Sequence, residues 1–287
     1  MNHRESLCFQ PIAIGSSAHL LMHSYGPAEG TGPRAYIQAT LHADEIPGLL
    51  VNHHLIKLLD DAEKSGSILN PISVIPFANP IGLSQQLLGS HIGRFSLDTG
   101  VNFNRDWPDV ASSVASKIEG KLTDDQISNV KLIREAICVA VDEDRNLKVE
   151  AVLKKKLYKI AATSDVVLDL HCDTDAVMHM YTHDRLWPQM SDLARELKSE
   201  CHLLASNSGG NPFDEACSCI WASLADKFPG FPIPMACQSV TVELRGEVDV
   251  RKDSLLFNIP HCPPFPAEVH DCVNMNRGRA CFSSVLA

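Results

Sequence analysis

The sequence lacks the features that define disulfide-rich, secreted and membrane proteins. Its 287 residues include 10 cysteines but no CxxC pair, so the usual spacing for zinc on cysteines is absent. The N-terminal MNHRESLCFQ has no apolar h-region, and no run approaches the roughly 18 apolar residues of a membrane span. We therefore expect no signal peptide, no membrane partner, and a reducing, cytoplasmic location in which free thiols persist.

Positive charge is also scarce. The chain has 25 Lys and Arg against 35 Asp and Glu, a formal net charge of -10. This balance argues against nucleic-acid binding by bulk electrostatics, so no nucleic-acid partner is expected. The content of 45% hydrophobic and 21% charged residues is ordinary for a soluble globular protein, and the length allows one large core with a small appendage.

Runs typical of strands alternate with runs typical of helices. Strands are predicted at 9–14, 19–24, 35–41, 71–77, 164–170, 177–182, 202–205 and 238–244, and helices at 46–59, 123–141, 147–162, 188–199 and 214–228. The pattern indicates an α/β fold with a mixed, mostly parallel central sheet flanked by helices. The long polar loop at 82–106 is typical of a functional segment.

Two local features refine this prediction. Thr123 and Gln126 fit a capping box at the start of a helix. The basic run at 154–156 is interpreted as a solvated helix face. We expect a catalytic domain at 1–253 and an irregular tail at 254–287, where prolines and cysteines cluster without a sustained period.

Three predicted buried strands end close to an ionisable residue: His42, His171 and Glu243. In open α/β sheets, ligands bind outside the carboxyl ends of the strands. Two imidazoles and one carboxylate suit zinc and leave a position for water, a ligand set known from carboxypeptidase A. His42, Glu45 and His171 form such a set. Glu243 is then the candidate that takes a proton from water and delivers it to a leaving nitrogen.

Asp169 and Asp173 flank His171, and either one is a candidate for orienting its ring. An ordinary surface or turn role is the preferred interpretation for both.

A second polar cluster lies at Asn104 and Arg105, with Arg94 upstream. An arginine fork matches a carboxylate in bidentate geometry, and Asn adds a neutral donor. Arg94 is a candidate for stabilising an oxyanion. The alternative is that both arginines pair with nearby acids on the surface.

Together these residues resemble the succinylglutamate desuccinylase/aspartoacylase family, within the wider zinc carboxypeptidase clan. The matching motifs, spread over 35–245, are His42-Ala43-Asp44-Glu45, Asn79-Pro80, Arg94, Asn104-Arg105, Asp169-Leu170-His171 and Thr241-Val242-Glu243-Leu244. The resemblance implies that His42, Glu45 and His171 bind one zinc ion per chain. It also implies that Glu243 is the general acid/base, that Arg94 polarises the scissile carbonyl, and that Asn104 and Arg105 grip a substrate carboxylate.

The resemblance implies hydrolysis of an amide between an acyl group and an amino acid. Family members commonly add a small β-rich domain, whereas only a short stretch follows Glu243 here, so the tail at 254–287 is interpreted as a truncated form of that domain. Two alternatives stay open: a zinc carboxypeptidase acting on short peptides, and a non-catalytic carboxylate-binding relative. The sequence is compatible with a homo-oligomer.

Overall fold

A computed structural model describes residues 3–9, 15–28, 30 and 32–250. The expected strand at 9–14 lies outside these residues except for Phe9, which ends a strand that begins at His3. The expected tail at 254–287 and the domain boundary before it also lie outside the described residues.

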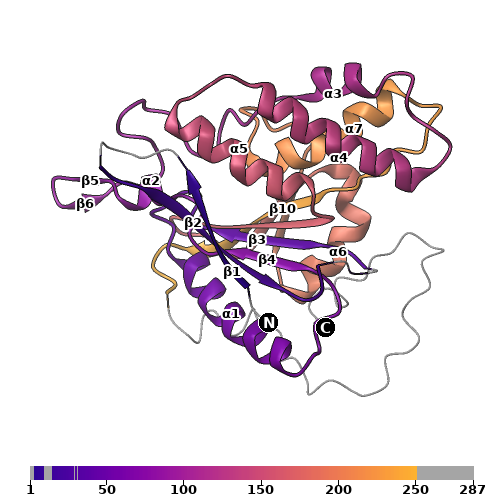
Figure 1. The fold of residues 1–287 in the computed structure, drawn as a ribbon. Helices are drawn as coiled ribbons and strands as arrows, with labels where there is room; N and C mark the ends of the chain where they lie inside the picture. Colours follow the sequence, from indigo (N-terminus) through magenta and orange to yellow (C-terminus); the bar gives the residue numbers. More distant parts are fainter. Residues whose placement is uncertain (1–2, 10–14, 29, 31, 251–287) are drawn as a thin grey trace.

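The centre of the fold is a sheet in the order β1–β2–β4–β3–β7–β10–β8–β9 (Figure 1). Its strands are β1 (His3–Phe9), β2 (Ala18–Tyr25), β3 (Ala35–Ala39), β4 (Ile72–Ile75), β7 (Val166–Asp173), β8 (His179–Thr182), β9 (Cys201–Leu204) and β10 (Gln238–Gly246). A separate small hairpin consists of β5 (Gln86–Leu87) and β6 (Ser90–His91).

The sheet has a parallel centre. Strand β3 runs parallel to β4 and β7, and β7 runs parallel to β10. Antiparallel pairs lie toward the edges, where β2 pairs with β1 and β4, and β8 pairs with β10. The predicted mixed sheet is therefore confirmed, and the carboxyl ends of β3, β7 and β10 lie at the same edge.

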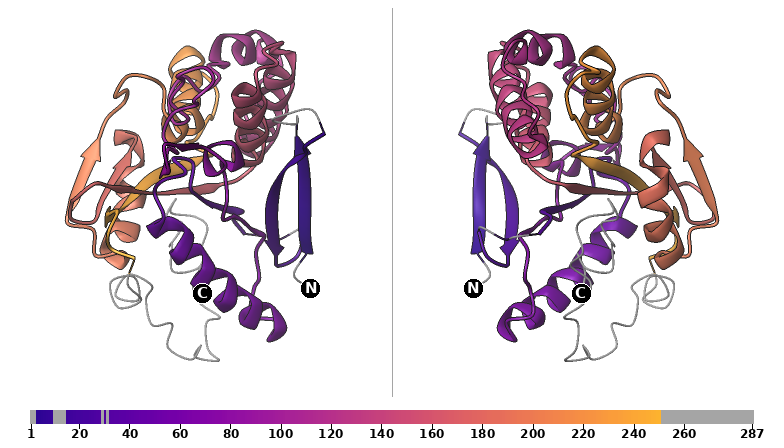
Figure 2. Two further views of the ribbon diagram at one scale, coloured as in Figure 1. Left: turned by 90° about the vertical axis from the view of Figure 1, so that its left-hand side faces the viewer. Right: turned by 90° about the vertical axis from the view of Figure 1, so that its right-hand side faces the viewer.

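Helices cover both faces of the sheet (Figure 2). One layer consists of α3 (Ala111–Ile118), α4 (Gln126–Glu143), α5 (Val149–Ala162) and α7 (Phe213–Lys227). The other layer contains α1 (Pro47–Lys64) and α6 (Trp187–Glu196), while α2 (Pro80–Leu83) and the 3-10 turn η1 (Asp184–Leu186) are short connections. Neighbouring residues of β3 enter different cores, Tyr36 under the first layer and Ile37 under the second, because side chains alternate along a strand.

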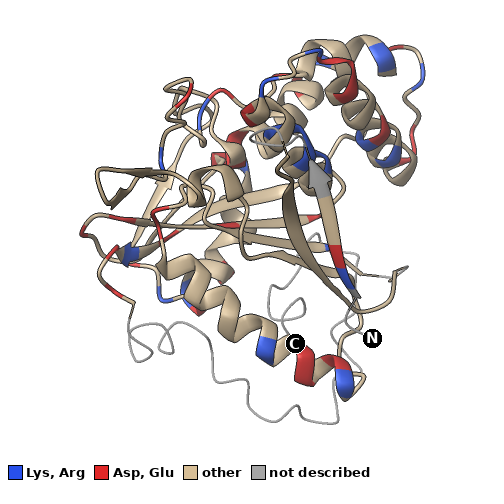
Figure 3. Ribbon diagram, turned by 60° about the vertical axis from the view of Figure 1, so that its left-hand side comes forward, with Lys and Arg blue, Asp and Glu red and all other residues tan. Residues whose placement is uncertain are grey.

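Acidic and basic residues are interspersed along the described chain (Figure 3). None of the helices in the described ranges is long and apolar enough to cross a membrane.

The start of α4 differs from the predicted capping box. The cap is Asp125, whose Oδ2 accepts a hydrogen bond of 2.9 Å from the Ser128 N–H. Thr123 lies outside the helix, where its own N–H donates to Asn129 Oδ1 at 2.9 Å. Aspartate is at least as favourable an N-cap as threonine, so Asp125 caps the helix in place of Thr123. Helix α3 was not predicted, because it is short and rich in serine.

Two strands extend further than predicted. His171 and Glu243 lie within β7 and β10 instead of marking their ends, because the parallel ladder continues and pairs these two residues directly.

The interpretation of the basic run as a solvated face is wrong for Lys154. This side chain is 4% exposed, and its Nζ donates to the main-chain oxygens of Asn102 and Arg105. Lys154 lies in the buried stripe of α5, four residues from both Glu150 and Tyr158. It thus attaches α5 to the loop that carries Arg105.

Candidate metal centre

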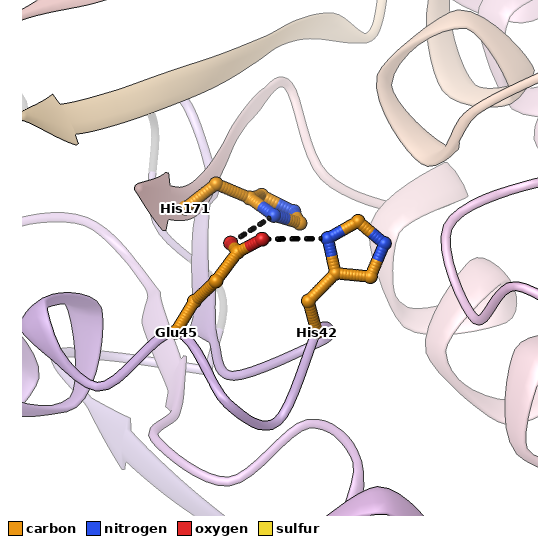
Figure 4. Close-up of side chains that lie close together, drawn as sticks. All are labelled: His42, Glu45 and His171. Atoms are coloured by element: carbon orange, nitrogen blue, oxygen red, sulfur yellow. Dashed lines mark hydrogen bonds and ion pairs between the residues drawn. The ribbon is translucent and has the colours of Figure 1, made fainter. Parts of the chain in front are cut away.

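Three side chains from separate parts of the chain converge at the carboxyl edge of the sheet (Figure 4). His42 and Glu45 lie in the turn between β3 and α1, and His171 lies on β7. One ligand atom of each residue lies within 4.8 Å of the others. All three side chains are buried. The structure thus brings together the three residues that the sequence predicts as metal ligands.

Close packing shapes the turn that carries His42 and Glu45. The Glu45 N–H donates to the His42 carbonyl oxygen at 3.1 Å, which closes the turn. Helix α1 starts directly afterwards, with Pro47 in its first turn. A Cβ on Gly48 would lie 3.0 Å from the Leu170 carbonyl oxygen, so glycine lets α1 approach β7 closely.

Glu45 bridges the two imidazoles. Its Oε1 lies 2.8 Å from His42 Nδ1, and its Oε2 lies 2.7 Å from His171 Nδ1. Each ring has a partner on its other nitrogen. His42 Nε2 lies 2.9 Å from Asn102 Oδ1, and His171 Nε2 lies 2.9 Å from Asp169 Oδ2.

This arrangement fits a bound cation. Asn102 Oδ1 also accepts the Asn104 N–H at 2.8 Å, which identifies it as an oxygen and makes His42 Nε2 the donor. Burial lowers the pKa of His42, so the neutral ring turns the lone pair of Nδ1 toward a Glu45 oxygen. Two acceptors then face each other at 2.8 Å. A metal ion between them would satisfy both.

The charges around Glu45 also favour its ionised form. Burial alone would raise the pKa of Glu45, but the charge of His171 above all holds it well below its usual range. Arg94 adds an ion pair, with Nη1 2.8 Å from Glu45 Oε1. Burial alone would lower the pKa of His171, whereas Asp169 and Glu45 together raise it well above the usual value. Glu45 is therefore available as an anionic ligand.

The preferred interpretation of Asp169 as a surface or turn residue is wrong. Its side chain is fully buried, and its Oδ1 accepts a hydrogen bond of 2.9 Å from Gln38 Nε2. Gln38 is held in turn by the Tyr36 hydroxyl, which donates to its Oε1 at 2.6 Å. Asp169 thus orients His171 from inside the sheet. Asp173 has the turn role, since it is exposed and accepts the Thr174 N–H at 2.9 Å.

A cavity of about 300 Å³ adjoins the candidate metal ligands. Glu243 lines it, and its Oε2 is buried without a hydrogen-bond partner among the described residues. Burial raises the pKa of Glu243 to about 7, with His171 acting to lower it and Glu45 acting to raise it. A carboxyl group with this pKa can both accept and donate a proton near neutral pH.

The two residues predicted to bind a substrate carboxylate also line this cavity. Asn104 Oδ1 accepts the Phe213 N–H at 2.8 Å, so this oxygen attaches the loop to the start of α7. Arg105 Nη1 donates to the Asn104 carbonyl oxygen at 2.7 Å. Its aliphatic part packs against Gly210, where a Cβ would lie 2.7 Å from Arg105 Cδ and where φ is +75°.

Among the residues that the structure describes, neither Arg94 nor Arg105 forms an ion pair with a surface acid, which was the alternative interpretation. Arg94 also lines the cavity and pairs with the buried Glu45. Arg105 has no carboxylate within ion-pair distance among the residues that the structure describes.

Sequence reasoning missed Asn102 and Lys154 as supports of the site. Asn102 orients His42, and Lys154 binds the main chain of the same loop. The signal for Asn102 was its position two residues before Asn104, in the polar loop at 82–106 that was predicted to be functional. The signal for Lys154 was its place in the apolar stripe of a helix.

The fold and the His–Glu–His cluster define an α/β protein of the zinc carboxypeptidase-like fold with a candidate metal centre. Residues 31–133 match the family model of the succinylglutamate desuccinylase/aspartoacylase catalytic domain. The resemblance to this family predicted from the motifs is thereby confirmed. Comparison with curated proteins gives no match.

Solved structures show the same likeness. A protein named for the succinylglutamate desuccinylase/aspartoacylase family from Shewanella amazonensis is 27% identical, with a TM-score of 0.78 over 90% of this chain and 70% of its own. A second such protein, from Shewanella frigidimarina, is 26% identical, with a TM-score of 0.78 over 90% of this chain and 69% of its own. The ectoine utilization protein EutE (DoeB) from Ruegeria pomeroyi shares the fold at 15% identity, with a TM-score of 0.57 over 90% of this chain and 64% of its own.

Proposed function

We propose that the protein is a zinc-dependent amide hydrolase that removes the acyl group from an N-acyl amino acid or a similar small carboxylate-bearing amide. The observation that carries the proposal is the pair of imidazole Nδ1 atoms facing one carboxylate, 2.8 and 2.7 Å away, beside a cavity lined by Glu243 and Arg105. The match to the desuccinylase/aspartoacylase catalytic domain supports it.

His42, Glu45 and His171 would hold the zinc ion. A zinc ion bound there acts as a Lewis acid and lowers the pKa of water toward neutrality. Asn102 and Asp169 accept hydrogen bonds from the Nε2 atoms, so the two Nδ1 atoms are the ones that face Glu45 and would bind the ion. His171 would give up its Nδ1 proton when the ion binds.

Glu243 moves the proton. In its ionised form it accepts a proton from the water molecule that attacks the amide carbon. It then donates that proton to the amide nitrogen as the C–N bond breaks, so that a carboxylic acid and an amine are released. Its buried Oε2, which has no hydrogen-bond partner in the described part of the chain, and its pKa of about 7 suit both steps.

The two arginines have different proposed roles. Arg105, with Asn104, would bind the carboxylate of the substrate. Arg94, whose side chain is 47% exposed and lies at the cavity wall, would polarise the scissile carbonyl. The cavity of about 300 Å³ favours a small substrate over a long peptide.

The test combines metal content with a substrate panel. We expect elemental analysis to find about one zinc per chain after reconstitution, and none in His42→Ala, because one of the three protein ligands is lost. We also expect N-acyl amino acids to be hydrolysed faster than dipeptides. Zinc retained in His42→Ala would contradict the ligand assignment. Preference for dipeptides would favour the carboxypeptidase alternative, and zinc binding without any hydrolysis would favour the non-catalytic one.

A further inference from the structure

The cavity beside the metal centre has an apolar part to which the proposed reaction assigns no role. Tyr181 and Leu203 line it, and both are large hydrophobic side chains that are more than a third exposed, at 37% and 40%. Ala205 and Pro212 line the same cavity. Single exposed hydrophobic residues are ordinary on a protein surface, whereas a group of them in the wall of a ligand cavity indicates where an apolar group binds.

The strand register places the two large side chains next to each other. Tyr181 on β8 pairs with Leu203 on β9, and on its other side it pairs with Thr241 on β10. Neighbouring strands lie about 4.8 Å apart, and the side chains of paired residues project from the same face of the sheet. These three residues therefore form one row across three strands, and all of them line the cavity.

The adjacent row of the sheet carries the proposed chemistry. Glu243 pairs with His171 on one side and with His179 on the other. Tyr181 is thus a diagonal neighbour of Glu243, and such neighbours lie roughly 7–8 Å apart, within reach of a long side chain. Burial is the main cause that raises the pKa of Tyr181, Glu243 acts in the same direction, and Arg105 opposes them. The apolar part of the wall therefore lies close to the groups that would hold and cleave the substrate.

The Tyr181 ring is held in place without a substrate. It makes an edge-to-face contact with His179, with ring centroids 5.4 Å apart and an angle of 67° between the planes. The His179 ring is itself fixed by a hydrogen bond of 2.9 Å between its Nδ1 and the Val177 carbonyl oxygen. A preorganised aromatic side chain binds an apolar group at a small cost in conformational entropy.

A position at the edge of the sheet is a simpler reason for exposure, and it applies to part of this region. Strand β9 is the last strand of the described sheet, and Leu204 is 42% exposed without lining the cavity. Successive residues of a strand point to opposite faces, so the edge position alone accounts for Leu204. It does not account for Tyr181, because β8 lies between β10 and β9. The Tyr181 ring is uncovered where the cavity opens.

Building on the proposed function, we propose that Tyr181 and Leu203 form a subsite for an apolar group of the substrate. The protein then hydrolyses N-acyl amino acids with an aliphatic or aromatic group in preference to those with a second charged group. Such a substrate can carry the apolar group in its acyl chain or in its amino-acid side chain. Both sources present the same chemistry to the subsite, and the test distinguishes them.

The test uses two pairs of substrates that match in shape and differ in charge. The zinc-loaded full chain would be assayed with N-acetylleucine against N-acetylaspartate, and with N-(4-methylpentanoyl)alanine against N-succinylalanine. We expect kcat/KM for the apolar member of at least one pair to exceed that of the charged member by about tenfold or more. A preference in the first pair assigns the subsite to the side chain, and a preference in the second pair assigns it to the acyl chain.

Variants connect this preference to the subsite. We expect Tyr181→Ala and Leu203→Ala each to reduce the ratio by about threefold or more, because apolar contact area is lost. Leu204→Ala is the matched control, since it removes a leucine of similar exposure from the other face of the same strand. Tyr181→Phe keeps the ring, so the ratio is expected to persist. Loss of the ratio in Tyr181→Phe, or an equal loss in Leu204→Ala, would overturn the inference.

Binding of the products provides a readout without turnover. By calorimetry, we expect leucine to bind more tightly than aspartate, or 4-methylpentanoate more tightly than succinate, and Tyr181→Ala to lose the difference. Hydrolysis without preference for the apolar member of either pair would overturn the inference and leave the proposed function intact. Absence of hydrolysis, with the apolar product still bound more tightly in the wild type than in Tyr181→Ala, would count against the proposed function and support the subsite.

Discussion

Asp169 Oδ2 lies 2.9 Å from His171 Nε2, and one residue separates the two on β7. Alternate residues of a strand project from the same face, so the sequence spacing places the carboxylate beside the ring. Gln38 on the adjacent strand β3 fixes the other oxygen of Asp169 at 2.9 Å. Both carboxylate oxygens are thus engaged, and the imidazole has a defined orientation.

This contact predicts that Asp169→Asn weakens zinc binding. An asparagine has one acceptor oxygen where the aspartate uses two, so it cannot accept from both His171 and Gln38. We expect the zinc affinity, measured by competition with a chromophoric chelator, to fall by about 10–100-fold. Asp173→Asn, which alters an exposed turn carboxylate, is the control. Unchanged affinity in Asp169→Asn would show that the contact does not support the metal.

Glu243→Gln separates proton transfer from metal binding. Glutamine retains the shape but cannot accept a proton, so we expect kcat to fall by about 10²–10⁴-fold with the zinc content unchanged. Glu247→Gln provides a matched exposed control. Full activity in Glu243→Gln would show that Glu243 does not transfer the proton. Loss of zinc in this variant would show that Glu243 is a metal ligand.

Arg105→Ala tests the carboxylate site. Removal of a charged hydrogen-bonding partner is expected to raise KM by about 10–100-fold with a smaller effect on kcat. The exposed Arg145→Ala is the control. A fall in kcat at unchanged KM would contradict a binding role.

Lys154→Met tests the support of the loop. The methionine fills the same space but leaves the main-chain oxygens of Asn102 and Arg105 without their donor. We expect the free energy of unfolding, from urea titration, to fall by about 1–3 kcal/mol. Lys156→Met is the matched control on the same helix. Equal free energies of unfolding for the two variants would mean that these hydrogen bonds make no net contribution to stability.

Asp214 predicts a pH dependence of stability. Burial is the main cause that raises the pKa of Asp214 from 3.8 to about 7. The folded state therefore holds this proton more tightly than the unfolded state does. The stability it contributes is fully present below about pH 4 and is lost as the pH rises through about 7.

We accordingly expect metal-free Asp214→Asn to be more stable than the wild type at pH 8, by roughly 2–4 kcal/mol, and nearly equal to it at pH 4. Urea unfolding at both pH values measures this difference, with Asp124→Asn as the control. Parallel stability curves for wild type and Asp214→Asn would contradict the assignment.

Much of the fold followed from local signals. The run at 35–41 indicated a buried strand because it is nearly continuous in apolar residues, and β3 forms there. The ends of elements were less predictable. A capping side chain fixes the start of α4, and pairing with a neighbouring strand decides where β7 stops, so neither boundary is a property of one segment alone.

The sequence by itself determined the candidate ligands. His42 and Glu45 share one turn, and the parallel order of β3, β7 and β10 brings His171 and Glu243 to the same edge of the sheet. Only the tertiary structure decided which residues support them. Asn102 approaches His42 from 60 residues away in the chain, and Gln38 reaches Asp169 across 131. Such contacts leave no local pattern in the sequence, because they arise when separate segments pack together.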